Sequence, residues 1–454
     1  MQSINPATGE IIHEYAAFTD RQIESSVAKA QKCFLQWKML PFSERAGFLI
    51  KAANILRERK ASLAVLMADE MGKLLGDGEA EIEKCAVACE YYARNAEAFL
   101  QDEIIKTDAR KSFITYQPLG VILAIMPWNF PFWQVIRFAA PNLMAGNVAV
   151  LKHASNVCGC ALEIESIFRD AGFPEGCFTT LLVSSEAVDS IIAHPYIRGV
   201  TLTGSTEAGK SVARKAGECL KKTVLELGGS DAYVVLADAD IEKAAVECAK
   251  SRLINAGQSC IAAKRFIVLS SVKASFENHF IAYFKTIRAG HPKDNSSGIG
   301  PLARLDLRDA LHKQVLRSIE KGAKLMLGGE TTKEKGAFYP PTILSNVTPG
   351  MPAFDEELFG PVAAIIEAKD EEEAFALANS TSFGLGSAIF TSDTSRAENL
   401  ARTAIDAGQT FVNAFVRSDP RLPFGGTKES GYGRELGSLG IREFVNAKTV
   451  YIAK

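Results

Sequence analysis

Cys260 ends a run of residues whose types suggest covalent chemistry, Asn-Ala-Gly-Gln-Ser-Cys at 255–260. Glu226 lies upstream in Leu-Glu-Leu-Gly-Gly at 225–229. A thiolate can attack an electrophilic carbon, and a carboxylate can activate the water that releases a covalent intermediate. Both residues have small, glycine-rich neighbours that let a substrate approach the backbone. The two runs therefore predict a cysteine nucleophile with a glutamate as its base.

The other cysteines do not share these surroundings. The chain has nine cysteines, and most cysteines in intracellular proteins are buried packing residues. Cys85 and Cys89 are spaced as on one face of a helix, which is typical of packing. Cys158 and Cys160 have no His or Cys partner at zinc spacing, so we predict no metal site. The odd count also argues against a secreted, disulfide-stabilised protein.

Composition excludes several other classes of protein. A chain of 454 residues is long enough for two or three domains. Its net charge of −2 gives no electrostatic footprint for nucleic acid or an anionic membrane. The N-terminus lacks the pattern of a signal peptide, and no apolar run reaches transmembrane length. We therefore expect a cytoplasmic protein that binds neither nucleic acid nor membrane.

The elements that must position these residues follow from the hydrophobic pattern. Helical spacing at 20–38, 43–59 and 78–100 precedes a strand at 111–116. Strands and helices then alternate: strands at 121–126, 148–152, 178–183 and 199–203, and helices at 136–145, 161–171, 187–194 and on through Ala216. This βαβ rhythm predicts an α/β fold with a parallel, doubly wound sheet.

A second α/β unit is predicted from about Ser230 to Phe424. It begins with a strand at 233–236 and a helix at 241–255, and it continues through a strand at 265–269. The strand-like stretch 445–452 follows a glycine-rich segment and has no obvious local partner. We expect this tail to pair with another subunit.

One glycine loop has three interpretations. Residues 204–211, Gly-Ser-Thr-Glu-Ala-Gly-Lys-Ser, match the P-loop pattern between a strand and a helix, which would indicate an ATPase or kinase. However, Glu207 would oppose the phosphate charges in such a cradle. A helix N-terminus that holds one dinucleotide pyrophosphate tolerates this residue, and a simple helix cap needs no ligand. The loop alone leaves these alternatives open, and no GxGxxG fingerprint is present.

Several motifs in one order resemble the aldehyde dehydrogenase superfamily, from Asn5 almost to the C-terminus. They are Pro-Trp-Asn-Phe-Pro (127–131), Leu-Lys (151–152), Thr-Gly-Ser-Thr (203–206), Leu-Glu-Leu-Gly-Gly (225–229), Gly-Gln-Ser-Cys (257–260), Glu-Leu-Phe-Gly-Pro (357–361), Pro-Phe-Gly-Gly (423–426) and Gly-Arg-Glu (433–435). This resemblance favours the dinucleotide interpretation of the glycine loop.

The resemblance implies a fold of three parts. These are a Rossmann-like dinucleotide-binding domain at 1–104 and 121–229, an α/β catalytic domain at 230–425, and a small β oligomerisation arm and tail at 105–120 and 426–454. The arm implies a homodimer or homotetramer.

The resemblance also assigns catalytic roles. Cys260 attacks an aldehyde, Asn129 and the Cys260 backbone N–H stabilise the oxyanion, and hydride transfer leaves a thioester. Glu226 activates the water that hydrolyses it, and Glu435 resembles a second carboxylate that relays protons.

A nicotinamide dinucleotide is the implied cofactor. Its implied binding residues are Trp128, Lys152, Ser155, Gly204, Ser205, Leu227, Glu357 and Phe359. NAD-preferring relatives often have Glu at the position of Ser155, where it would repel a 2′-phosphate. Ser155 beside Lys152 therefore favours NADP over NAD. His153 also stands where the family usually has Pro.

Within the superfamily, the chain looks most like the succinate-semialdehyde dehydrogenases. The resemblance places Arg137, Arg417 and Ser418 in the substrate site, with Arg137 as the clamp for the distal carboxylate. A second arginine of some relatives is replaced by Ile254, so either Arg417 substitutes for it or the carboxylate is held more weakly. The alternative is a broader aldehyde dehydrogenase for other short or medium aldehydes.

Overall fold

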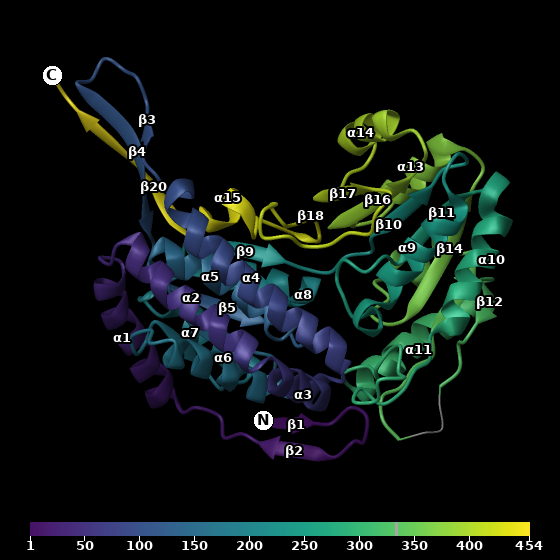
Figure 1. Cartoon of the computed structure of the whole chain (residues 1–454), viewed down its shortest axis with the longest axis horizontal. Coiled ribbons are helices and arrows are strands. Elements are labelled where there is room, and N and C mark those ends of the chain that lie inside the picture. The colour runs from purple at the N-terminus through teal and green to yellow at the C-terminus, as the bar shows by residue number, and fades with distance from the viewer. Residues whose placement is uncertain (332–334) are drawn as a thin grey trace.

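A computed structural model of the chain describes residues 1–331 and 335–454, which form two α/β units and a projecting β arm (Figure 1). The chain begins with an antiparallel pair, β1 (Gln2–Ile4) and β2 (Ile11–Glu14). Four helices follow: α1 (Asp20–Trp37), α2 (Phe42–Glu58), α3 (Lys60–Met71) and α4 (Leu75–Phe99). The hydrophobic pattern predicted three of these helices and missed α3, which only Arg59 separates from α2.

The first unit is built on a six-stranded sheet in the order β19-β9-β8-β5-β6-β7. Its strands are β5 (Val121–Met126), β6 (Val148–His153), β7 (Phe178–Thr180), β8 (Ile197–Thr203), β9 (Lys222–Glu226) and β19 (Gly431–Tyr432). All are parallel except β19. The helices are α5 (Trp133–Ala145), α6 (Cys158–Asp170), α7 (Val188–Ala193) and α8 (Thr206–Glu218). The predicted parallel, doubly wound sheet is confirmed.

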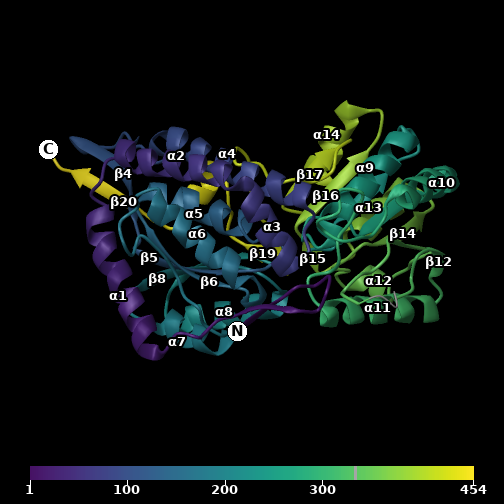
Figure 2. The same cartoon turned by 60° about the horizontal axis from the view of Figure 1, so that its bottom comes forward.

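Helices cover both faces of this sheet. Figure 2 shows it as a layer with α2 and α4 on one side and α7 and α8 on the other. β5 and β8 are neighbours in the sheet although β6 and β7 come between them in the chain. This is the point where the strand order reverses, and ligands of doubly wound sheets bind beside the carboxyl ends of such strands.

The second unit has a seven-stranded sheet in the order β12-β13-β14-β11-β10-β16-β17, parallel except for β12. Its strands are β10 (Ala232–Val235), β11 (Arg265–Leu269), β12 (Lys324–Leu327), β13 (Thr342–Ser345), β14 (Val362–Ala368), β16 (Gly386–Phe390) and β17 (Gln409–Val412). Its helices are α9 (Ile241–Leu253), α10 (Ser270–Thr286), α11 (Leu305–Glu320), α12 (Pro352–Asp355), α13 (Glu371–Asn379) and α14 (Thr394–Thr403). Each unit has its own apolar core.

The arm is a three-stranded antiparallel sheet in the order β20-β4-β3. β4 (Lys111–Pro118) pairs along its whole length with β20 (Val445–Ile452), and β3 (Glu103–Ile104) pairs on its other side. The stretch 445–452 thus has a ladder partner in its own chain, β4, which the sequence did not indicate. Pairing of this tail with another subunit stays a prediction, and β20 is the edge strand of the arm. The predicted tail at 426–454 also includes elements that lie on the first unit. β19 joins the first sheet, and α15 (Gly437–Ile441) packs on α4 and α5.

Among the described helices, none is both long enough and apolar enough to cross a bilayer.

Candidate active site

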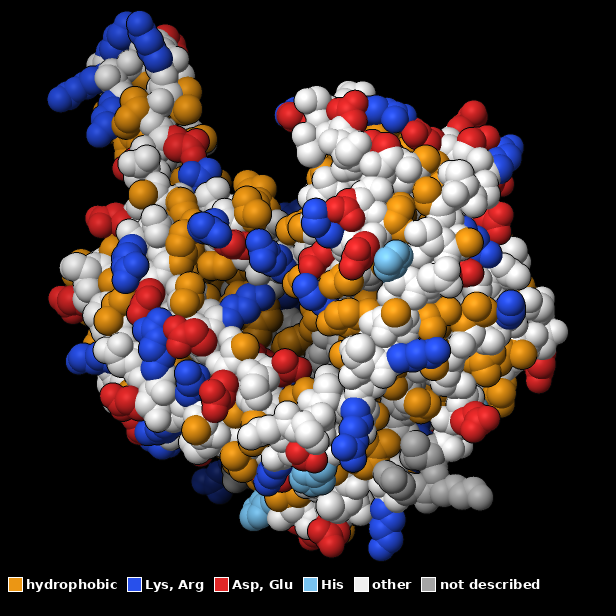
Figure 3. All heavy atoms as spheres, turned by 45° about the vertical axis from the view of Figure 1, so that its right-hand side comes forward, with side chains coloured by type: hydrophobic (Ala, Val, Ile, Leu, Met, Phe, Trp, Pro, Cys, Tyr) orange, Lys and Arg blue, Asp and Glu red, His pale blue; other side chains and the backbone are white. Residues whose placement is uncertain are grey.

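Cys260 lies between the two units, where two cavities meet at its side chain. Figure 3 shows the surface hollowed between the units. We name the cavities after one residue of each, the Arg137 cavity of about 230 Å³ and the Trp128 cavity of about 260 Å³. Both are lined by Cys260 and by Gln134 of α5. A group bound in either cavity can therefore approach the same sulfur.

The loop that carries Cys260 has an unusual backbone. Asn255 and Ala256 follow α9 with φ of 52° and 54°, in the left-handed region. Such residues cost about 1–3 kcal/mol each and persist where surrounding structure holds them. Gly257 has a φ of 76°, and a Cβ there would lie 2.1 Å from the Gly360 carbonyl oxygen. The predicted helix at 241–255 therefore ends at Leu253, because the loop turns sharply toward the nucleophile.

Buried hydrogen bonds hold this loop in place. The Lys264 Nζ donates to the carbonyl oxygens of Ser259 at 2.9 Å and Cys260 at 2.5 Å. The Gln258 Oε1 accepts from the Ala303 N–H at 2.8 Å. Lys264 is fully buried and also forms an ion pair with Glu357 at 3.3 Å. One buried cation thus fixes the backbone of the nucleophile and touches a carboxylate of the Trp128 cavity.

The thiol of Cys260 is neutral in these surroundings. Burial raises the pKa of Cys260 to about 12, although Lys264 and Arg137 pull this pKa down. The sulfur is therefore protonated near neutral pH. Activation of the nucleophile requires an added positive charge or a base beside it.

Asn129 lies against the Cys260 loop. Its Nδ2 donates to the Gln258 carbonyl oxygen at 3.0 Å, and its own carbonyl oxygen accepts from the Asn255 Nδ2 at 2.8 Å. The side chain is buried and lines the Trp128 cavity together with Cys260. One amide N–H of Nδ2 remains for an oxyanion formed next to the sulfur, as an oxyanion hole requires.

His153 holds the loop that carries Asn129. It accepts from the Ala154 N–H at Nδ1, so the proton is on Nε2, which donates to the Pro131 carbonyl oxygen at 2.9 Å. Burial lowers the pKa of His153 to about 4, so the ring is neutral. The histidine thus ties the end of β6 to the end of the 127–131 loop, a contact that proline could not make.

Glu226 and Glu435 are buried beside Arg137, behind the cavities. Arg137 forms an ion pair with Glu435, donates to the Thr203 hydroxyl at 3.3 Å, and lies over the Phe424 ring at 4.6 Å. Burial and the charge of Glu435 raise the pKa of Glu226 well above its usual range. Burial likewise raises the pKa of Glu435, against the attraction of Arg137. Two carboxyl groups thus compete for one guanidinium.

Glu226 is set apart from the two cavities that meet at Cys260. Glu226 ends β9 but is absent from the linings of both cavities, and neither of its carboxyl oxygens has a hydrogen-bond partner among the described residues. An unpaired buried carboxyl group is costly. A role as base therefore requires its side chain to turn toward the Trp128 cavity.

The Trp128 cavity has the features of a dinucleotide site. Its lining is Pro127, Trp128, Asn129, Gln134, Thr203, Gly204, Ser205, Leu227, Gly228, Cys260, Leu307, Glu357 and Phe359. The cavity thus brings together six of the predicted cofactor residues at the carboxyl ends of β5 and β8. Ser205 caps α8 through the Ala208 N–H at 3.3 Å, and helix N-termini favour phosphate.

Glu357 and Gly228 complete this fit. The Glu357 Oε1 accepts from the Gly229 N–H at 3.0 Å, and a Cβ at Gly228 would lie 2.6 Å from the Glu357 Oε2. Phe359 meets Trp128 edge to face at 5.8 Å. Carboxylate, aromatic and helix-terminal groups therefore suit a ribose, a planar ring and a pyrophosphate.

Lys152 and Ser155 lie outside the lining of this cavity, at and just after the end of β6. Burial lowers the pKa of the half-buried Lys152. Ser155 is exposed and begins a short 3₁₀ helix. Both lie at the carboxyl end of the strand next to β5, where the far end of a dinucleotide would lie.

The P-loop interpretation does not fit the structure. Lys210, its phosphate-binding lysine, is half exposed and pairs with Glu429 at 3.0 Å and Glu207 at 3.7 Å. The glycine loop instead opens on the cavity that contains the Cys260 sulfur.

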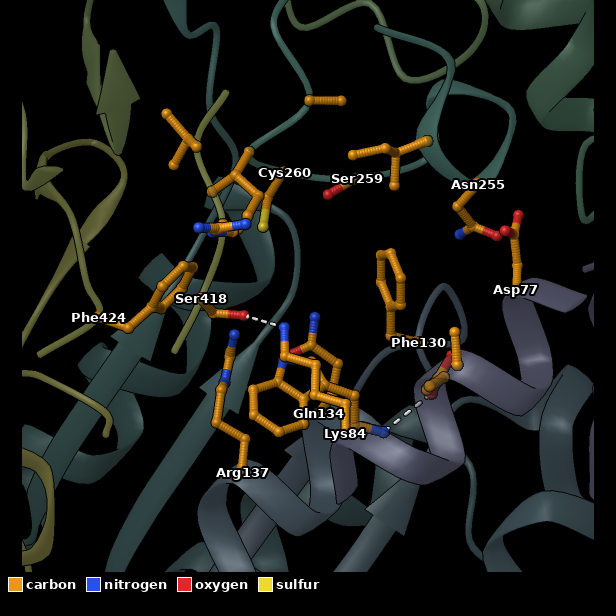
Figure 4. Close-up of a pocket in the computed structure, with 18 of the residues that line it drawn as sticks. Asp77, Lys84, Phe130, Gln134, Arg137, Asn255, Ser259, Cys260, Ser418 and Phe424 are labelled. Carbon is orange, nitrogen blue, oxygen red and sulfur yellow. Dashed lines mark hydrogen bonds between the residues drawn. The ribbon is translucent and has the colours of Figure 1, made fainter. Parts of the chain in front are cut away.

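The Arg137 cavity contains all three predicted substrate residues, Arg137, Arg417 and Ser418. Its apolar walls include Phe130, Trp133, Ile261, Phe415 and Phe424. Figure 4 shows Cys260 across the cavity from Arg137 and Lys84. Sequence analysis missed Lys84 and Gln134, and it also missed Lys264 beneath the nucleophile. Gln134 lies one helical turn before Arg137 on the same face, a spacing that could have indicated it.

Comparison with known proteins agrees with this geometry. The model of the aldehyde dehydrogenase family matches residues 1–450. The chain is 50% identical over 451 residues to a probable succinate-semialdehyde dehydrogenase (NADP+) of Synechocystis sp., with 99% of each chain covered. It is 47% identical over 454 residues to a succinate-semialdehyde dehydrogenase (NADP+) of Mycobacterium avium, covering 99% of this chain and 96% of the relative. The structure of succinic semialdehyde dehydrogenase from Streptococcus pyogenes in complex with NADP+ superposes with a TM-score of 0.97 at 39% identity, covering 100% of both chains.

Proposed function

The chain belongs to the aldehyde dehydrogenase family, and from this premise we propose that it oxidises succinate semialdehyde to succinate with NADP. The observation that carries the proposal is the position of Cys260. Its sulfur lies between a cavity suited to a dinucleotide and a cavity lined by cationic side chains. The similar enzymes of Synechocystis sp. and Mycobacterium avium are named for this substrate and for NADP+.

The residues divide the reaction into two steps. The Cys260 thiol gives up its proton to water in the cavity. The thiolate sulfur then forms a bond to the aldehyde carbon while the C=O π bond breaks, which leaves a thiohemiacetal oxyanion for Asn129 and the Cys260 N–H. The bound nicotinamide supplies the acceptor for the hydride that leaves this carbon. The result is a thioester on Cys260. Water then attacks the thioester carbon, the C–S bond breaks, and succinate and the thiol are released.

We assign the water-activating role to Glu226. A carboxyl group whose pKa is raised is a stronger base once ionised, which suits it to take a proton from water. Glu435 lies beside Glu226 and forms an ion pair with Arg137. We propose that this proton passes from Glu226 to Glu435.

We propose that the cofactor is held by Trp128, Lys152, Ser155, Gly204, Ser205, Leu227, Glu357 and Phe359. Ser155 carries no charge that would repel a 2′-phosphate, and Lys152 is nearby with a cationic side chain. NADP is therefore the favoured cofactor, with NAD as the weaker alternative.

A broader aldehyde range is the second candidate. The aromatic side chains of Phe130, Trp133, Phe415 and Phe424 line the Arg137 cavity. Such walls bind uncharged alkyl or aromatic aldehydes as well as a short semialdehyde.

We further propose that the chain forms a homodimer or homotetramer in the cytoplasm through the arm. Ile104, Tyr451 and Ile452 are large apolar side chains that the arm exposes. Exposed apolar groups of this kind mark contact surfaces.

Initial rates would test the proposal. Reduced-nicotinamide absorbance should be followed with succinate semialdehyde and hexanal, each with NADP and with NAD. We expect the highest kcat/KM for succinate semialdehyde with NADP. A higher kcat/KM for hexanal would favour the broader function, and absence of turnover with every pair would overturn both.

A further inference from the structure

Lys84 is a cation inside the Arg137 cavity that has no carboxylate partner among the described residues. It projects from α4 and donates to the Ser418 hydroxyl at 2.7 Å. Its Nζ also lies 4.1 Å from the centre of the Trp133 ring. No ion pair within residues 1–331 and 335–454 includes it. The nearby carboxylates are already engaged, since Glu81 pairs with Lys73 and Asp419 pairs with Arg421.

Arg137 differs from Lys84 in this respect. Its guanidinium already forms an ion pair with Glu435, and one of its nitrogens donates to Thr203. A substrate carboxylate that approached Arg137 alone would meet a cation whose charge is largely compensated. Arg417 also lines the cavity without an ion pair among the described residues, but its side chain is exposed to solvent, whereas Lys84 is half-buried. Because buried charges require partners, Lys84 is the shielded cation that leaves a positive charge for a ligand.

The polar groups of the cavity are unevenly distributed. Figure 4 shows Arg137, Lys84 and Ser418 on one side of Phe130, and Asp77 on the other. An anionic group would be attracted to the first side and repelled from the second. The Arg137 cavity therefore has a polarity that orients a molecule with one charged end.

We propose that Lys84 binds the distal carboxylate of the aldehyde substrate, with Ser418 and Arg137 as accompanying donors, and that it determines the preference for a semialdehyde acid. This inference rests on the proposed function and names the residue that selects its substrate class. Lys84 takes no part in bond making or breaking. Its ammonium group forms charge-assisted hydrogen bonds to the carboxylate while the aldehyde end reaches Cys260.

The ionisation of Lys84 supports this role. Burial, followed by the charge of Arg137, lowers the pKa of Lys84 to about 8. Glu81, Cys85 and Asp419 act in the opposite direction. Arg417, Asp77 and the thiol of Cys260 are the remaining ionisable groups that line the cavity with Lys84 and Arg137. An arriving carboxylate would restore the charge that burial disfavours.

A substitution with matched substrates tests the proposal. Lys84→Met keeps the length of the side chain and removes its charge. Rates should be measured with succinate semialdehyde, its uncharged terminal amide, and butanal. We expect kcat/KM for succinate semialdehyde to fall roughly ten- to hundredfold, mainly through KM. The fall for the amide and butanal should be at least ten times smaller. Lys84→Arg should recover part of the loss, and Arg94→Met, which removes an exposed cation from the same helix, is the control.

The outcomes separate the two proposals. If the unmodified protein does not prefer succinate semialdehyde to butanal, the proposed function fails. If it has this preference and Lys84→Met lowers all three rates equally, the role of Lys84 fails. Should that variant not fold, the unmodified protein provides a second test. The ratio of kcat/KM for succinate semialdehyde to that for butanal should decrease as pH rises through about 8. A ratio that stays constant with pH would overturn the inference.

Discussion

Ser155 is the residue at which cofactor choice can be tested most simply. It is exposed just after β6, so a longer side chain has room there. Ser155→Glu introduces a carboxylate that should repel a 2′-phosphate and accept a hydrogen bond from a 2′-hydroxyl. We expect a shift of roughly 1–2 kcal/mol toward NAD, the scale of one charge contact near a surface. The measurement is the ratio of kcat/KM for NADP and NAD. Ser190→Glu, an exposed change on α7, is the control, and an unchanged ratio in Ser155→Glu would refute the assignment.

Lys264 sets the charge beneath the nucleophile. Its cation lowers the pKa of Cys260, which burial raises. Removing the cation should therefore raise this pKa further and leave less thiolate at any given pH. We expect Lys264→Met to be alkylated by iodoacetamide more slowly than the unmodified protein, with the rate–pH curve displaced to higher pH. Lys250→Met, a surface change on α9, should leave the curve in place. Equal alkylation rates in Lys264→Met and the unmodified protein would show that Lys264 has only a structural role.

At the scale of elements, sequence patterns predicted the strands and helices whose formation depends on neighbouring residues. The alternation of apolar strands and amphipathic helices indicated the parallel sheet of the first unit. β5 has its predicted bounds, β6 ends one residue later than predicted, and β8 begins two residues earlier. Motif order placed Cys260, Asn129 and the glycine loop at one cavity. Patterns of this kind are contained within single elements or in their sequence neighbours.

Contacts between distant segments were not predicted. The pairing of β20 with β4 joins residues more than three hundred positions apart, and neither strand encodes its partner. The ion pair of Arg137 with Glu435 and the hydrogen bond of Lys84 to Ser418 are similar cases. The left-handed backbone of Ala256 was not predicted either, because alanine disfavours that conformation. Such a residue is held by the hydrogen bonds around it.

At the scale of the whole molecule, the proposed assembly surface on the arm lies apart from the described catalytic residues. β20 forms one edge of the arm, and the described catalytic residues lie outside it. Truncation after Phe444 should remove β20. The edge of β4 that pairs with β20 would then be exposed. We expect a smaller assembly in sedimentation or light scattering. Lys454 deletion alone removes only the terminal residue beyond β20 and serves as the control. An unchanged assembly size after truncation would contradict the role of the arm.

The covalent intermediate is the central claim, and Glu226→Gln provides its most direct test. This variant should form the thioester and fail to hydrolyse it quickly, because the amide cannot take a proton from water. The protein should be mixed with NADP and succinate semialdehyde, quenched in acid, digested and analysed by mass spectrometry. We predict a burst of reduced cofactor and one succinyl group on the peptide that contains Cys260, with none when Cys260→Ala is added to Glu226→Gln. A burst without the adduct, or an adduct on another cysteine, would contradict the account.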